Sequence, residues 1–167
     1  MNYFYLDASA LGKRYVTETG TPLVNRLFES VPRRRMIALV LALGELLSIL
    51  VRRRNSGRLP ERVYRQALVE LRSEVVEEPD FALHSVSDEL VRDSLPLIER
   101  HSLNATDALV LRSALDVADA VRKTGDDVVL VSSDSRLVAA ARTCGLPVWN
   151  PEVDDHATLD ALTAGGT

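Results

Sequence analysis

The sequence of 167 residues contains a single cysteine, Cys144, so the chain cannot form an internal disulfide. Scarce cysteine favours a reducing compartment, and the first residues lack the basic segment and cleavage site of a secretory leader, so we expect a cytoplasmic protein. The sequence also has no glycine-rich phosphate loop and no dinucleotide fingerprint. Nothing in its motifs therefore indicates a nucleotide cofactor.

Long hydrophobic runs are also missing. The most apolar stretch, residues 37–51, has fifteen residues and is interrupted by Glu45. A membrane-spanning helix needs about 20 apolar residues. This stretch is therefore predicted to be a buried core helix, with no membrane partner.

Positive charge is not in excess, because 24 acidic residues face 20 basic ones and the formal net charge is −4. The arginines nevertheless include two triplets, Arg33–Arg35 and Arg52–Arg54. A solvated surface is the usual role of such runs. Contacts to RNA phosphates by Arg52, Arg53 and Arg54 are the alternative, because arginine binds phosphate in a bidentate way.

The apolar pattern alternates between strand and helix along the chain. Strands are predicted at about 2–7, 36–39, 81–86, 127–132 and 146–149, and helices at about 21–30, 60–78, 105–123 and 135–144, with others after residues 9, 40 and 87. This alternation predicts a three-layer α/β fold with a central parallel sheet of about five strands and helices on both faces. Residues 1–151 are expected to form a single domain, and residues 152–167 a flexible tail.

Four carboxylates stand where such a fold would gather them at one edge of the sheet. Asp7 and Asp134 each follow a strand, and Asp107 lies in the first turn of a helix after Asn104. Each of these three could simply cap a helix. Glu45 lies inside an apolar helix where no cap explains it, and a buried carboxylate without a partner costs several kcal/mol. The set therefore suggests a bound cation.

The type of ligand indicates which cation. Carboxylate oxygens suit Mg²⁺ or Mn²⁺ rather than zinc. The three histidines, His84, His101 and His156, share no spacing typical of a zinc site. The first hypothesis is therefore a metal-dependent phosphodiesterase.

The chain resembles the PIN-domain nucleases, and among them the VapC-type toxins of toxin–antitoxin systems. The likeness runs over residues 2–151 and rests on an ordered set of short motifs: Leu6–Leu11, Glu45, Leu103–Leu109, Val131–Leu137 and Val148–Pro151. It implies that Asp7, Glu45, Asp107 and Asp134 are the catalytic and metal-binding acids, with Ser9 and Ser132 in support. One departure is Ala38–Leu41, where the family often has a Ser/Thr-rich strand end.

The resemblance also implies an activity and partners. We expect an endoribonuclease that uses one or two Mg²⁺ or Mn²⁺ ions and inhibits translation by cutting tRNA, rRNA or mRNA. A cognate antitoxin and a homodimer are implied as well. Three alternatives stay open: a catalytically silent PIN-type module that binds RNA or protein, a metal-dependent DNA nuclease, and an unrelated α/β fold in which the acids are only caps.

Overall fold

A computed structural model gives the fold and describes residues 1–164. Its centre is a parallel sheet of five strands in the order β3-β2-β1-β4-β5. The strands are β1 (Asn2–Leu6), β2 (Met36–Leu39), β3 (Ala82–His84), β4 (Asp127–Val131) and β5 (Val148–Trp149). Each lies where the sequence predicts a strand, and the predicted three-layer α/β fold is confirmed.

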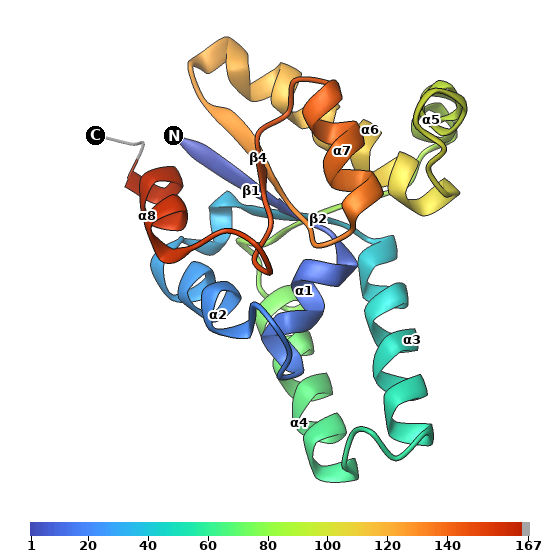
Figure 1. The fold of residues 1–167 in the computed structure, drawn as a ribbon, viewed down its shortest axis with the longest axis vertical. Helices are drawn as coiled ribbons and strands as arrows, with labels where there is room; N and C mark the ends of the chain where they lie inside the picture. Colours follow the sequence, from blue (N-terminus) through green and yellow to red (C-terminus); the bar gives the residue numbers. More distant parts are fainter. Residues whose placement is uncertain (165–167) are drawn as a thin grey trace.

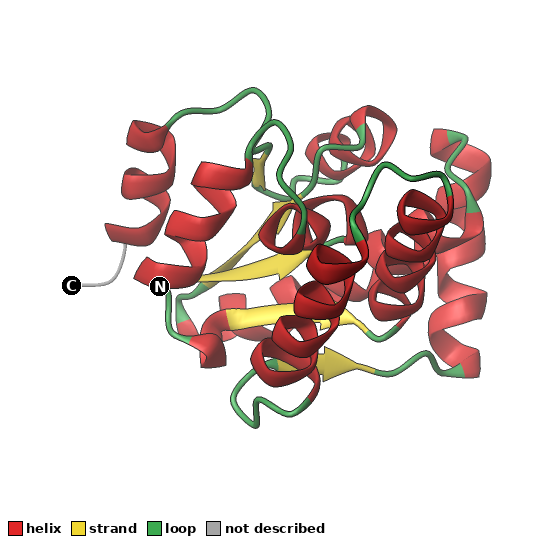
Figure 2. Ribbon diagram, turned by 90° about the horizontal axis from the view of Figure 1, so that it is seen from below, coloured by secondary structure: helices red, strands yellow, loops and turns green. Residues whose placement is uncertain are grey.

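Helices cover both faces of the sheet, as Figures 1 and 2 show. The α-helices are α1 (Ala8–Tyr15), α2 (Thr21–Ser30), α3 (Leu41–Asn55), α4 (Glu61–Leu71), α5 (Asp88–His101), α6 (Ala105–Val121), α7 (Ser135–Thr143) and α8 (His156–Ala164). Successive strand residues point to opposite faces. Phe4 and Leu6 therefore enter the core beneath α1 to α4, while Tyr5 enters the core beneath α5 to α7.

The strand order reverses at β1, and this reversal positions the site. The chain runs from β1 outward to β2 and β3, then crosses back to add β4 and β5 on the other side of β1. Ligands bind in open α/β sheets beyond the carboxyl ends of the strands at such a point. Leu6 pairs with Val131 at the ends of β1 and β4, so the residues that follow each strand lie side by side.

Helix α3 differs from its prediction. Only the stripe formed by Ala42, Leu46 and Leu50 is buried, whereas Leu47 is 43% exposed and Glu45 lies on the exposed side. The prediction of a buried core helix is wrong, because α3 packs one face on the core and leaves the other over the sheet edge. No helix within residues 1–164 is both long and apolar enough to cross a bilayer.

Residues 156–164, which the sequence analysis assigned to a flexible tail, form helix α8. Asp155 accepts a hydrogen bond from Thr158 N at 2.9 Å and so caps the helix. Leu159 is fully buried, and the carbonyl of Leu162 accepts a hydrogen bond from Asn2 Nδ2 at 2.9 Å. The helix was not predicted because the segment is rich in polar and small residues, and Leu159 is its one buried residue. Residues 165–167 of the expected tail lie outside the described residues.

Candidate metal centre at the carboxyl edge of the sheet

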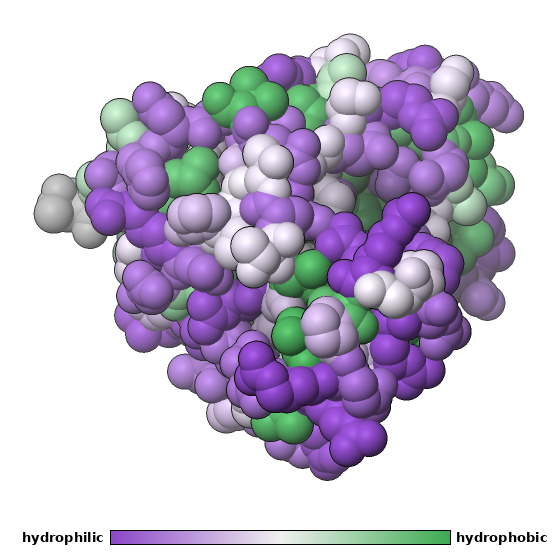
Figure 3. Space-filling view, turned by 60° about the horizontal axis from the view of Figure 1, so that its bottom comes forward, coloured by the Kyte–Doolittle hydropathy of each residue, from purple (hydrophilic) through white to green (hydrophobic). Residues whose placement is uncertain are grey.

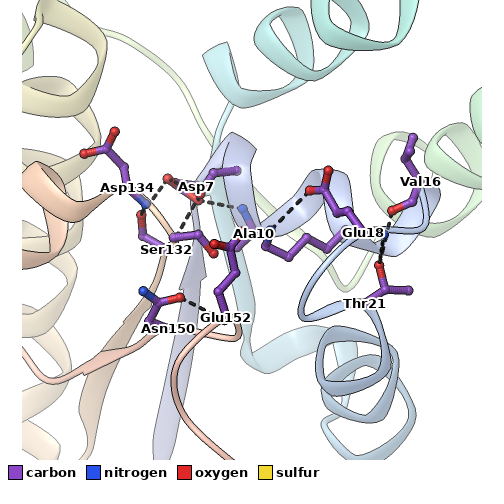
Figure 4. A network of polar contacts seen from close by, with 12 residues as sticks. Asp7, Ala10, Val16, Glu18, Thr21, Ser132, Asp134, Asn150 and Glu152 are labelled. Atoms are coloured by element: carbon purple, nitrogen blue, oxygen red, sulfur yellow. Dashed lines mark hydrogen bonds and ion pairs between the residues drawn. The ribbon is translucent and has the colours of Figure 1, made fainter. Parts of the chain in front are cut away.

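Asp7 is the most deeply buried of the four acids, with 6% of its surface exposed. It caps α1 by accepting a hydrogen bond from Ala10 N at 2.8 Å. Ser9 Oγ and Ser132 Oγ each donate to its carboxylate at 2.8 Å. Figure 4 shows Asp7 between Ala10 and Ser132, with Asp134 beside them. The carboxylate is therefore fixed from three sides.

Burial also changes the acidity of this group. Loss of hydration raises the pKa of Asp7 to about 6, although hydrogen bonds from Ala10, Ser132 and Ser9 act in the opposite direction. The negative charge of Asp134 makes a smaller contribution to this rise of the pKa. A carboxylate whose charged form is disfavoured in this way gains from a nearby cation.

Asp134 caps α7 at the end of β4. Its Oδ1 accepts hydrogen bonds from Arg136 N and Leu137 N, both at 2.9 Å, and no hydrogen bond to its Oδ2 occurs within residues 1–164. Ser132 Oγ accepts a hydrogen bond from Asp134 N at 3.1 Å while donating to Asp7. Ser132 therefore ties two of the acids together, and Asp134 keeps one oxygen for a ligand.

Asp107 reaches the same place from the first turn of α6. Asn104 caps this helix by accepting from Asp107 N at 2.8 Å, and its amide donates to Asp107 Oδ2 at 2.8 Å. Partial burial and, after it, the negative charges of Asp134, Asp7 and Glu45 together raise the pKa of Asp107 to about 6. Each of the other three acids is thus close enough to Asp107 to disfavour its ionisation.

The four acids line one cavity of about 510 Å³, which we call the acid cavity. Glu45 reaches it from the exposed face of α3 together with Gly44 and Ser48. The sequence indicated that Glu45 is a buried carboxylate, and this prediction is wrong because the residue is exposed. Its side chain instead faces the cavity from α3, without a hydrogen bond or ion pair in the described part of the chain.

The cavity fits a hard divalent cation in its donors but is not preformed around one. Carboxylate oxygens are the ligands that Mg²⁺ and Mn²⁺ prefer. Yet within residues 1–164 no three acidic, histidine or cysteine side chains already converge as a metal-binding group. Like charges keep apart without a cation. Asp7 and Asp134 are both held by the helix caps they form, so rotation of the Glu45 side chain, which has no partner within residues 1–164, is the movement that would close the set.

A second cavity, of about 290 Å³, adjoins the first and shares Ala8, Ser9, Ile49 and Asp134 with it. Lys13 is 2% exposed there and pairs with Glu18 at 3.2 Å and with Glu152. Sequence reasoning missed this network. No local signal could have revealed it, because Lys13 and Glu152 are 139 positions apart in the chain.

The arginines of the second triplet have different surroundings. Arg53 pairs with Glu18 at 2.5 Å, and the guanidinium of Arg54 lies 4.5 Å from the centre of the Tyr64 ring. Arg52 is exposed and lines the acid cavity, with no hydrogen bond or ion pair within residues 1–164. Of the three, Arg52 is therefore the one whose charge is available to a ligand in that cavity.

Known structures share this fold. A protein from Pyrobaculum aerophilum (PAE2754) has a TM-score of 0.61 and 20% identity, with 98% of this chain and 99% of that chain covered. VapC20 from Mycobacterium tuberculosis, described as a sarcin–ricin-loop-cleaving toxin, has a TM-score of 0.57 and 19% identity, with 82% and 94% covered. A toxin–antitoxin complex from Klebsiella pneumoniae gives 0.51 and 18%, with 88% and 96% covered.

No protein-family profile matches the sequence, and neither does any curated protein. The structural likeness at this low identity shows a shared fold, over 82–98% of this chain, and no more than the fold. What the site does has to be argued from its own residues.

Proposed function

We propose that this chain is a Mg²⁺- or Mn²⁺-dependent endoribonuclease and the toxin of a toxin–antitoxin pair. One observation carries the proposal: four carboxylates from four separate segments line a single cavity where the strand order reverses. Helix capping explains the positions of Asp7 and Asp134, but it explains neither Glu45 nor the convergence of all four acids. The cavity therefore favours an enzyme over an α/β scaffold with scattered caps.

The chain's own residues divide the work in this proposal. Asp7, held by Ser9 and Ser132, gives the site a fixed carboxylate. Asp134, Asp107 and Glu45 would complete the ligand set, with Glu45 turning toward it from α3. One or two bound Mg²⁺ or Mn²⁺ ions would supply an activated water molecule and stabilise negative charge on the phosphate. The exposed guanidinium of Arg52 lines the same cavity and supplies positive charge to the RNA backbone beside the acids.

Fold-level likeness supports the substrate and partner assignments. VapC20 is described as cleaving the sarcin–ricin loop, and the Klebsiella pneumoniae protein was solved with its antitoxin. By analogy we infer an RNA substrate in tRNA, rRNA or mRNA, an antitoxin that blocks the cavity, a homodimer and a cytoplasmic location. An analogy of fold alone does not carry function, so the direct test concerns RNA.

The test is cleavage of total cellular RNA by the purified protein in Mn²⁺, with new 5′ ends mapped, beside an Asp7→Asn variant. Asparagine keeps the cap of α1 but removes the charge. We expect discrete cuts that the variant does not make. Equal patterns from both folded proteins would contradict the nuclease and favour a silent RNA- or protein-binding module, and cuts in DNA but not RNA would reassign the substrate.

A further inference from the structure

A third cavity, of about 430 Å³, lies at the carboxyl-terminal end of α3 and the turn that follows. Its lining consists of Ile49, Arg52, Arg53, Ser56 and Arg58. Three of these five residues are arginines, so we call this cavity the arginine groove. It lies at the end of the α3–α4 hairpin. Figure 3, in which the bottom of the molecule comes forward, shows a mostly hydrophilic face with smaller apolar patches.

The arginine groove is continuous with the acid cavity. Ile49 and Arg52 line both of them. Glu45 and Arg52 are seven residues apart on α3, which is about 10.5 Å along a helix at 1.5 Å per residue. That length equals about three nucleotide steps at the 3.4 Å rise of a stacked strand. A strand cut at the acids would therefore pass into the groove within a few nucleotides.

Two of the three arginines in the groove have unneutralised charges. Arg53 is paired with Glu18, whereas the side chains of Arg52 and Arg58 are exposed and form no ion pair or hydrogen bond within residues 1–164. Favourable interaction with the α3 dipole is the simpler role for cations at this helix end. That role explains the position of Arg52 but not that of Arg58, which lies beyond the helix and faces the same groove.

The acid cavity gives a reason for the groove to bind a polyanion. Four carboxylates repel a phosphodiester, so a nuclease of this design needs positive charge beside the acids to hold its substrate. The arginine groove carries such positive charge, and it adjoins the acid cavity, because Arg52 lines both of them.

We propose that the arginine groove binds the phosphates of the RNA strand on one side of the cleaved bond, with Arg52 and Arg58 as the contacts. The assignment of RNA rests on the proposed function. Arg53 lines both the groove and the cavity that contains Lys13. Because Glu18 already balances its charge, Arg53 is not one of the proposed contacts.

The salt dependence of RNA binding tests this proposal without any cleavage. The probe is a labelled single-stranded oligouridylate, titrated with the full-length protein in EDTA over a series of NaCl concentrations. Each phosphate contact contributes about −0.7 to the slope of log K against log salt for single strands. Arg52→Gln and Arg58→Gln should each make the slope shallower by about 0.7, and the double variant by about 1.4.

Arg34→Gln is the matched control. Arg34 is exposed and has no side-chain partner within residues 1–164, and it lies at the opposite edge of the sheet, just before β2. Its removal changes the net charge by the same amount and should leave the slope unchanged. The proposal is overturned if the wild type and both groove variants have equal slopes. It is also overturned if Arg34→Gln makes the slope shallower by as much as the groove variants do, or if RNA binding by the wild type does not depend on salt.

Two further arms separate the possible outcomes. Oligodeoxythymidylate in place of oligouridylate shows whether the groove distinguishes RNA from DNA, and equal affinity for both would overturn the assignment to RNA. If the groove variants lose slope while the wild type cuts no RNA, the groove stands and the proposed nuclease fails. If RNA is cut but the slopes do not change, the nuclease stands and the groove proposal fails.

Discussion

The two edges of the sheet treat charge in opposite ways. At the amino edge, the ammonium of Met1 pairs with Asp126 at 2.6 Å and Arg122 pairs with Asp127 at 2.8 Å. Arg35 Nε donates to the carbonyl of Asn2 at 2.7 Å. At the carboxyl edge, four carboxylates line one cavity, and two of them have pKa values raised to about 6.

This contrast indicates what each edge is for. Opposite charges at the amino edge hold the chain ends and strand starts together, and each partly exposed pair adds a modest amount to stability. Gathered like charges lower stability, so a sequence that keeps them has another reason to do so. Substitutions at the carboxyl edge should therefore have the largest effects, and these should be on activity. Substitutions at the amino edge should change stability alone.

Replacing Asp107 should have the largest effect. Asp107→Asn keeps the contact to Asn104 but removes one negative charge from the cavity, so Mn²⁺-dependent RNA cleavage should fall by more than about 100-fold, beyond what residues supporting a metal ligand usually contribute. Initial rates on a mapped RNA site measure this. Asp119→Asn, an exposed change on the same helix, is the control. Equal rates for the two variants would remove Asp107 from the site.

Ser132 should come next, because it hydrogen-bonds to Asp7 and to the backbone of Asp134. Ser132→Ala removes both contacts while leaving every carboxylate in place. We expect cleavage to fall by about 10–100-fold, the usual cost of losing a partner of a metal ligand, together with weaker Mn²⁺ binding by calorimetry. Loss of cleavage with unchanged Mn²⁺ affinity would show that Ser132 does not act by positioning the acids.

The pH dependence of stability should show how much the buried acid Asp7 at the carboxyl edge destabilises the fold. Because the pKa of Asp7 is about 6 in the folded protein and about 3.8 when unfolded, the folded state holds this proton more tightly. Without metal, stability should therefore fall as pH rises from about 4 to about 6 and stay lower above that, by on the order of 1–3 kcal/mol.

Urea unfolding in EDTA at several pH values measures this loss, with Asp7→Asn as the reference. Acids far from the cavity titrate equally in both proteins, so the difference between them reports Asp7 together with its effect on the pKa of Asp107. The variant should become the more stable of the two above pH 6. If the free energy of unfolding of the wild type instead increases relative to that of the variant as pH rises, the pKa of Asp7 is not raised in the folded protein.

The smallest expected effect lies at the amino edge. Arg35→Gln loses the hydrogen bond to Asn2 and the contact between the guanidinium and the Phe4 ring at 6.0 Å. We expect a loss of about 1–2 kcal/mol in the free energy of unfolding, with RNA cleavage by the folded fraction unchanged. Arg34→Gln should stay within about 0.5 kcal/mol of the wild type. A defect in cleavage from Arg35→Gln would break the division between the two edges.

The sequence predicted the sheet well because buried parallel strands are short apolar runs. Asp7 and Asp134 could be placed because each directly follows such a run, and carboxyl ends of parallel strands share one edge. Glu45 was found for the wrong reason, since an apolar run does not reveal which face of a helix is buried. Helix α8 was missed because Leu159 alone carries its burial.

Contacts between distant segments were out of reach. Lys13 gave no sign of its partner Glu152, and the different surroundings of Arg52 and Arg53 depend on where Glu18 lies after folding. The spacing of residues along the chain fixes neither of these. The acid cavity was therefore predictable as a set of acids, and its surroundings were not.

The most direct test of the central claim is to locate Mn²⁺ in crystals of the wild-type protein by anomalous diffraction. The account predicts a peak in the acid cavity, with Asp7 and Asp134 as ligands and with Glu45 turned toward the ion. It also predicts that Asp7→Asn crystals lose the peak. A cavity without manganese at millimolar concentration, in crystals where the four side chains are ordered, would contradict the claim that a cation gathers these acids.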